Sequence, residues 1–218
     1  MELELENIKD SLPLDELQAA LVDDPRNTDE FYNHTGKYVQ KLDLYLQEKL
    51  DVAEFLGLTE TRNLRILDIG SGIGLFSWIC QNLQHKCNST YYDKFPFYQA
   101  AWKILKIRSP VYLEIRANKQ WQMEVTKPYD LITAMRTVFD RYPTPWTAYN
   151  WMMFLEEARR YLRPKGRLFV KTNCSDEADA LMDEHSLRLL EPFTVNSFNS
   201  KTFLLTKEDI EKLIGSNR

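Results

Sequence analysis

The chain has 218 residues, of which 44% are hydrophobic and 28% charged, and its formal net charge is −4. This length and composition suit one generous α/β domain that needs neither disulfide bonds nor metal ions for stability. The negative net charge disfavours a broad phosphate-binding surface, and with it a nucleic-acid partner. No apolar run approaches the ~20 residues of a membrane span, and the acidic start MELELENIKD lacks the features of a signal peptide. We therefore expect a cytoplasmic protein with no membrane contact, and leave its oligomeric state open.

The first quarter of the chain predicts helices. Residues 1–27 are acidic, and the stretch PLDELQAALVDD within them predicts one short helix that begins at Pro13. From Thr28 to Phe55 apolar residues recur at helical spacing, with Leu42, Leu46 and Leu50 on one face.

After residue 63 short apolar runs alternate with helical patterns. Strands are expected at 64–69, 88–93, 111–117, 129–136 and 167–172, and helices at 75–83, 95–107 and 148–162. Residues 187–195 and 200–206 predict two further strands, an antiparallel hairpin at the sheet edge, before a last helix that begins at TKED. The alternation predicts an α/β fold: a doubly wound, Rossmann-like, seven-stranded and mostly parallel sheet.

The most informative stretch is RILDIGSGIGLFSWIC, residues 65–80, which holds three of the seven glycines. A glycine-rich turn between a strand and a helix lets backbone N–H groups approach a ligand without interference from Cβ atoms. A dinucleotide fingerprint is G-x-G-x-x-G, whereas Gly70, Gly72 and Gly74 form G-x-G-x-G, and Leu75 stands where the third glycine would be. Asp68, just before the turn, suits a ligand with a cationic amine better than a pyrophosphate. The stretch therefore favours an aminoacyl nucleoside.

LDIGSGIG resembles the first motif of class I S-adenosylmethionine-dependent methyltransferases. Three further segments resemble later motifs of that family in the expected order: the strand ending at Asp93, YDLITAM, and FLEEARRYLRPKGRLFV. The resemblance covers roughly residues 30–173, and DLITAMRTVFDRYPTPW is similar to a bacterial small-molecule group of the family without implying a particular substrate. S-adenosyl-L-methionine is the cofactor that this resemblance implies.

The resemblance also implies a set of cofactor contacts. Asp93 corresponds to the acid that binds both ribose hydroxyls, and Asn118 stands nearest the place of the family's adenine-binding acid, where this chain lacks the usual Gly-Asp pair. Asp68 either binds the methionyl amine or caps the neighbouring helix or turn, and both readings stay open. The expected contacts are Asp68, Gly70, Ser71, Gly72, Gly74, Asp93, Lys94, Phe95, Asn118 and Met135.

Candidate catalytic residues follow the fourth strand or precede the sheet. Asp140, Arg141 and Tyr142 come directly after the fourth strand, the point nearest the transferred methyl group, and His34 suits a general base by its intrinsic pKa. No metal ligands are expected. The other two histidines, His85 and His185, are expected at helix ends, where the helix dipole or solvent accounts for them.

Aromatic side chains divide between the core and the site. Trp121 lies either in the core or beside the adenine, and the second reading is favoured. Trp146 and Trp151 are expected in the core beneath a helix.

These observations predict a methyltransferase that acts on an oxygen or nitrogen atom of a small molecule by in-line transfer. We expect an acidic N-terminal extension at 1–27, a helical cap over the active site at 28–60, and a cofactor-binding core at 61–218. Three alternatives stay open. The chain is a binding or scaffolding protein without activity on the same fold, a nucleotide-dependent oxidoreductase, or, more weakly, an enzyme with a protein or RNA acceptor. Of these, the missing dinucleotide fingerprint counts against the oxidoreductase.

Overall fold

The computed structural model describes residues 2–22, 41–91, 96–108, 110–116, 119–123, 127–137, 146–172, 184–198 and 200–216. The described residues form a mixed α/β fold. The chain divides into two compact units, which we call unit 1 (Met1–Leu64 and Ser71–Val111) and unit 2 (Arg65–Gly70 and Tyr112–Arg218). Each unit is described by itself below.

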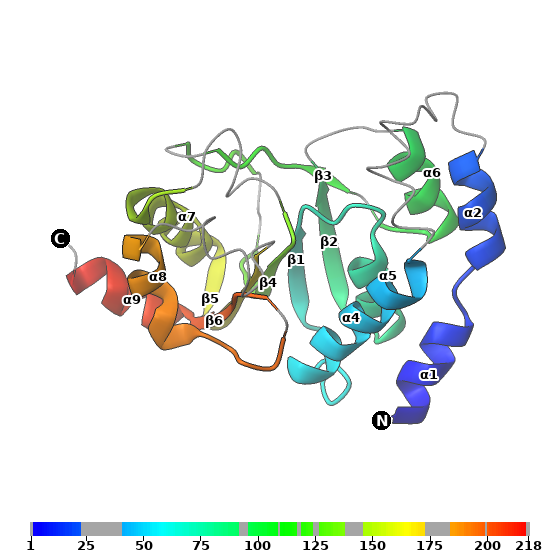
Figure 1. The fold of residues 1–218 in the computed structure, drawn as a ribbon, viewed down its shortest axis with the longest axis horizontal. Helices are drawn as coiled ribbons and strands as arrows, with labels where there is room; N and C mark the ends of the chain where they lie inside the picture. Colours follow the sequence, from blue (N-terminus) through cyan, green and yellow to red (C-terminus); the bar gives the residue numbers. More distant parts are fainter. Residues whose placement is uncertain are drawn as a thin grey trace. The chain divides into compact units, whose positions relative to one another are not determined.

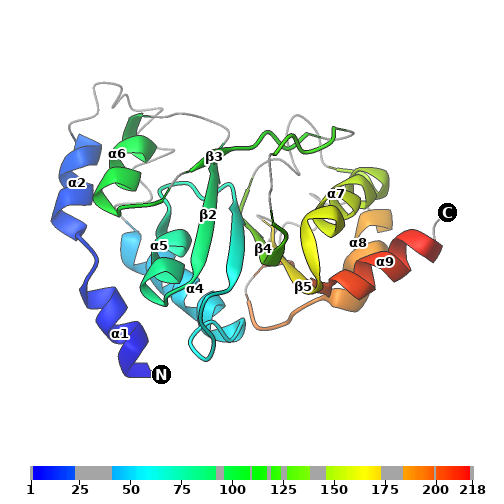
Figure 2. The ribbon, with the colours of Figure 1, turned by 180° about the vertical axis from the view of Figure 1, so that it is seen from behind.

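Unit 1 is largely helical. Its helices are α1 (Glu2–Asp10), α2 (Leu14–Val22), α4 (Leu42–Phe55), α5 (Leu75–Asn82) and α6 (Pro96–Ile104), and its strand is β2 (Lys86–Tyr91). The short strand β3 (Val111–Tyr112) starts at the last residue of unit 1. Helix α2 packs beside α6, and α4 packs on α5, which in turn covers β2 (Figures 1 and 2). The predicted face of α4 is confirmed, because Leu42, Leu46 and Leu50 are all buried. Residues 23–40, which include the start of the predicted helical zone, lie outside the described residues.

Unit 2 contains a mostly parallel sheet. The strands of unit 2 are β1 (Arg65–Ile69), β4 (Tyr129–Met135), β5 (Leu162–Lys171) and β6 (Thr202–Thr206). Strands β1 and β4 pair in parallel, with Asp68 opposite Thr133, and β4 and β5 pair in parallel, with Met135 opposite Lys171. Strand β6 runs antiparallel to β5. The predicted antiparallel strand next to the fifth strand is therefore confirmed.

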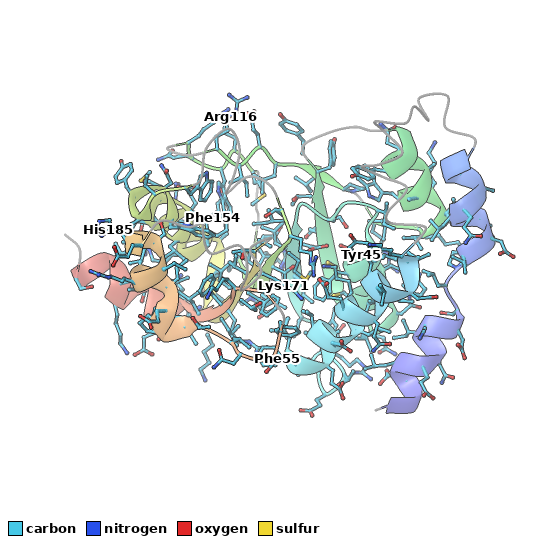
Figure 3. All side chains as sticks on the ribbon, in the orientation of Figure 1. Tyr45, Phe55, Arg116, Phe154, Lys171 and His185 are labelled. Carbon is cyan, nitrogen blue, oxygen red and sulfur yellow. The ribbon has the colours of Figure 1, made fainter. Side chains whose placement is uncertain are left out.

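Three helices complete unit 2. Helix α7 (Ala148–Tyr161) begins at a capping box formed by Thr147 and Asn150, and it packs against α8 (Glu184–Leu190) and α9 (Lys207–Ser216) beside β5 (Figure 1). The aromatic core lies under α7, from which Phe154 projects (Figure 3), and Trp146 and Trp151 contact Phe154 there. The prediction that these two tryptophans belong to the core is confirmed.

The first strand of the predicted C-terminal hairpin is wrong. Residues 187–195 fall mainly in α8 and in a short 3₁₀ helix, Glu191–Phe193, and only Thr194 makes an isolated antiparallel bridge, to Phe203. The buried residues of α8, Ser186 and Leu190, are four apart, which is a helical period, and Pro192 has no N–H group for a strand ladder. Six strands, rather than seven, are therefore found among the described residues.

Two other predicted strand boundaries also shift. Strand β5 begins at Leu162 rather than at 167, because the RPKG segment forms an irregularity in the ladder instead of a loop. Gly166 fits there because an added Cβ would lie only 3.0 Å from the carbonyl oxygen of Tyr129. Strand β3 keeps only Val111–Tyr112 of the expected 111–117.

No helix in the described ranges combines the length and the apolar character that a bilayer crossing requires.

Candidate functional site

Asp68 is a buried carboxylate near the end of β1. Its side chain is 2% exposed, and Thr133 on the neighbouring strand β4 donates its hydroxyl hydrogen to Asp68 Oδ1 at 2.9 Å. A carboxylate removed from water needs such donors, because burial without them costs several kcal/mol. Thr133 therefore fixes the orientation of Asp68. The sequence prediction missed Thr133, although a lone threonine inside the apolar run YDLITAM was a signal for it.

Gly70 follows β1 and needs to be glycine for two reasons. Its φ angle is +65°, a conformation that residues with a Cβ adopt only with strain. An added Cβ would also overlap the Cγ2 methyl group of Thr137, the second residue after β4. The backbone at this position is therefore bare because of the local packing as well as the turn.

The rest of the glycine turn belongs to unit 1 and is held by specific hydrogen bonds. The Ser71 N–H group and the Ser71 hydroxyl both donate to the carbonyl oxygen of Thr90 at 3.1 Å, and Trp102 Nε1 donates to the carbonyl oxygen of Gly72 at 2.8 Å. Gly72 and Gly74 have φ angles of +56° and +87°. Helix α5 starts directly after Gly74 without a side-chain cap at that residue. Because Gly74 has no side chain, it cannot accept hydrogen bonds from the first N–H groups of α5. In anion-binding and cofactor-binding turns such N–H groups bind the ligand.

Met135, the last residue of β4, is buried and lies opposite Lys171 at the end of β5. The next residue, Arg136, has a φ angle of +51° and donates its N–H group to the carbonyl oxygen of Lys171 at 2.7 Å. The ends of these two parallel strands are thereby tied together.

Lys171, the last residue of β5, is a buried lysine that the sequence analysis did not single out. It is only 3% exposed, and its Nζ lies 4.8 Å from the ring centroid of Phe198. Ser200, two residues further along the chain, has a buried hydroxyl with no hydrogen-bond partner among the described residues. The signal in the sequence was a lysine that ends the apolar run RLFVK.

Most of the other predicted site residues cannot be placed. His34, Asp93, Lys94, Phe95, Asn118, Asp140, Arg141 and Tyr142 lie outside the described residues. Three of the described site residues each lie beside a residue of unit 2: Asp68 beside Thr133, Gly70 beside Thr137, and Met135 beside Lys171. Ser71, Gly72 and Gly74 form the hydrogen-bonded turn of unit 1.

His85 lies just after the end of α5, as expected, and its backbone N–H group donates to the carbonyl oxygen of Cys80, but the expectation that solvent accounts for it is wrong because the side chain is buried. The ring is 4% exposed; its Nδ1 accepts the Leu64 N–H group at 3.2 Å, and its Nε2 lies 2.9 Å from the carbonyl oxygen of Leu58. Burial lowers the pKa of His85 from 6.5, the hydrogen bond to Leu58 opposes this shift, and the charge of Arg62 adds to it. His85 is therefore a structural link, whereas His185 is exposed on α8, as expected (Figure 3).

Trp121 belongs to the core of unit 2. Its ring stacks on Tyr161 with centroids 5.6 Å apart, and its backbone N–H donates to Glu157 Oε2 at 2.9 Å. Within the described ranges, no three His, Cys, Asp or Glu side chains are grouped so that they could hold a metal ion.

Comparison with solved structures finds matches at low sequence identity. DesVI from Streptomyces venezuelae is 16% identical with a TM-score of 0.47, and the match covers 68% of this chain and 57% of that one. The SAM-bound amino pentose methyltransferase CalS10 from Micromonospora echinaspora is 16% identical with a TM-score of 0.47, over 62% and 53% of the two chains. TrmN from Thermus thermophilus is 15% identical with a TM-score of 0.45, over 72% and 48%.

The chain thus spans between about half and three fifths of the length of these three structures. No curated protein matches it. A family model described as a methyltransferase domain matches residues 38–211, which is most of the sequence. The family expected from the glycine turn and the later motifs is confirmed: the chain belongs to the methyltransferase domain family.

Proposed function

We propose that this protein is an S-adenosylmethionine-dependent methyltransferase that methylates an oxygen or nitrogen atom of a small molecule. The observation that carries the proposal is the segment in which β1 ends with the buried Asp68 and runs through three glycines at positive φ into α5. Such a turn offers bare backbone and helix-start N–H groups to a ligand, and the acid supplies an acceptor for an amine. The family match supports the same reaction class.

Different residues of the chain would bind different parts of the cofactor. We assign the methionyl amine to Asp68, directly or through water, because Thr133 holds that carboxylate in one orientation. The backbone of Gly70, Ser71, Gly72 and Gly74 would lie along the cofactor, Asp93 would bind the ribose hydroxyls, and Lys94, Phe95 and Asn118 would surround the adenine. Met135 would lie near the reacting methyl group. When bound, the cofactor supplies a methyl group attached to a cationic sulfur, and this sulfur is left as a neutral thioether after the transfer.

The remaining task of the protein is to align the acceptor and, for a hydroxyl acceptor, to remove its proton. Alignment alone can account for about 7–11 kcal/mol of the barrier. We assign the acceptor side to Asp140, Arg141 and Tyr142 and the base to His34 or Asp140. An amine acceptor needs only to bind in its neutral form.

The regional division expected from the sequence is part of this proposal. Residues 1–27 would be an extension, 28–60 a cap that excludes water from the site, and 61–218 a doubly wound core. Of the cap, α4 is described, and it packs on α5 within unit 1.

Calorimetric titration with S-adenosylhomocysteine and, separately, with NAD tests the cofactor. We expect binding of S-adenosylhomocysteine alone, and loss of that binding in Gly72→Val. Gly57→Val is the matched control, since Gly57 also has a positive φ angle, +70°, but no atom lies within 4 Å of an added Cβ. Binding of NAD instead would support an oxidoreductase, and unchanged affinity in Gly72→Val would remove the turn from the site.

Turnover is tested with isotope-labelled cofactor and a small-molecule extract of the host, by mass spectrometry for a product heavier by one methylene. We expect Asp140→Ala or His34→Ala to lower turnover more than cofactor affinity. Cofactor binding with no product from any extract or acceptor library would favour the silent binding protein.

A further inference from the structure

Unit 1 contains a hollow of about 510 Å³, and among the described residues that line it there is none of the assigned cofactor contacts. Its walls come from the end of β2, from α6 and from the turn after α6, and include Tyr91, Gln99, Trp102, Lys103, Lys106 and Arg108. This volume lies within the range of small-molecule sites, about 300–1,000 Å³.

One wall is aromatic and held in place. Trp102 is 7% exposed, and its indole N–H is bonded to the carbonyl oxygen of Gly72, so the ring cannot turn without losing that hydrogen bond. The ring of Tyr91 lies beside it, with centroids 5.3 Å apart. A planar group entering the hollow would meet these rings without having to order them first.

The rim carries three cations in a short span. Lys103, Lys106 and Arg108 are all exposed, and none of them has an ion pair with an acidic side chain in the described part of the chain. The backbone of this turn is held by two hydrogen bonds, because the Lys106 N–H donates to the Lys103 carbonyl at 3.1 Å and the Arg108 N–H donates to Gln81 Oε1 at 3.2 Å. Three like charges around one hollow repel one another, and an anion with more than one negative charge would relieve that repulsion.

We propose that this hollow binds a small ligand that carries both a planar ring and phosphate groups, of which a nucleoside diphosphate is the simplest form. The ring would lie against Trp102 and Tyr91, and the phosphates would bind the three cations. The volume of the hollow suits one nucleotide rather than a strand. The net charge of −4 likewise opposes a long polyanion. The inference stands on unit 1 alone and does not require the proposed methyl transfer.

The test is calorimetric titration of the full chain with adenosine diphosphate at low salt, with adenosine and inorganic pyrophosphate as the two half-ligands. We expect the diphosphate to bind at least tenfold more tightly than either half-ligand. The double variant Lys103→Gln/Lys106→Gln should weaken it at least tenfold, since two charge-assisted contacts are lost. The matched control is Lys127→Gln/Lys165→Gln, which removes two exposed lysines of unit 2 and should leave the affinity unchanged.

A second arm separates this site from the cofactor site. Adenosine diphosphate should still bind after the protein is saturated with S-adenosylhomocysteine, and S-adenosylhomocysteine should bind normally to the Lys103/Lys106 variant. Mutual exclusion of the two ligands would make the hollow part of the cofactor site and overturn the inference. Absence of diphosphate binding, an equal loss in the control variant, or tighter binding of polyuridylate per site would overturn it as well.

Discussion

Gly70 provides the sharpest test of how the glycine turn is built. Replacing Gly70 with alanine adds one methyl group at a residue with a φ angle of +65°, next to the Cγ2 methyl group of Thr137. The variant therefore combines backbone strain with an overlap of two side chains. The chain offers controls for each contribution, because Gly57 has a φ angle of +70° but open space, and Gly215 has open space and no positive φ angle.

The magnitudes follow from these differences. A left-handed backbone costs a residue with a Cβ about 1–2 kcal/mol, which is the whole loss in stability expected for Gly57→Ala. Overpacking adds about 1–3 kcal/mol, so Gly70→Ala should lose about 2–5 kcal/mol. Gly215→Ala lies in helix α9 and should gain up to about 1 kcal/mol.

The free energy of unfolding in urea measures all three variants. The double variant Gly70→Ala/Thr137→Ser removes the overlapping methyl group but keeps the hydroxyl, and it should return to the loss seen for Gly57→Ala. If Gly70→Ala is no less stable than Gly57→Ala, or if Thr137→Ser recovers nothing, the packing argument for this glycine is refuted.

Three further predictions concern single contacts. Because the folded-state pKa of His85 is lowered below 6.5, the folded state favours the neutral ring, and the free energy of unfolding should decline as the pH falls below 6.5. Urea titrations at several pH values measure this dependence, and His85→Gln should remove the part of it that comes from this histidine. Thr133→Val should cost about 1–3 kcal/mol by removing the hydroxyl that donates to Asp68 Oδ1, whereas Thr133→Ser should cost less in the same assay. Thr147→Ala should cost about 1 kcal/mol through loss of the α7 capping box, and a thermal scan that detects no decrease would contradict that role.

The parts of the fold that the sequence predicted correctly are those with a repeating pattern or an ordered set of motifs. Strand β1, the glycine turn and α5 were predictable because an apolar run, three glycines and a helical pattern follow one another directly. The apolar face of α4 was predictable for the same reason. The segment at 187–195 failed because its apolar residues, Leu187, Leu189 and Leu190, fit a strand and a helix equally well over so short a span.

The interpretation of the glycines also changes with the structure. The sequence argument took their bare backbone as evidence of a ligand. Two of them have neighbours of their own, however: Thr137 at Gly70, and Ile107 and Trp102 at Gly74, where an added Cβ would come within 3.0–3.3 Å of those two side chains. Together with their positive φ angles, these neighbours favour glycine at both positions without any ligand. The case for a cofactor consequently depends more on Asp68 and on the order of the motifs than on the number of glycines.

Side chains whose role depends on the partner strand could not be predicted. Thr133 matters because the β1–β4 register places it opposite Asp68, and Lys171 matters because β5 ends opposite Met135. Neither register can be predicted from one strand, since alternation along a strand shows which side chains share a face but not which strand lies beside it.

The hollow of unit 1 could not be predicted from the sequence either. In the sequence, Lys103, Lys106 and Arg108 look like ordinary surface charges, and only the fold shows that they line one hollow with Trp102 and Tyr91.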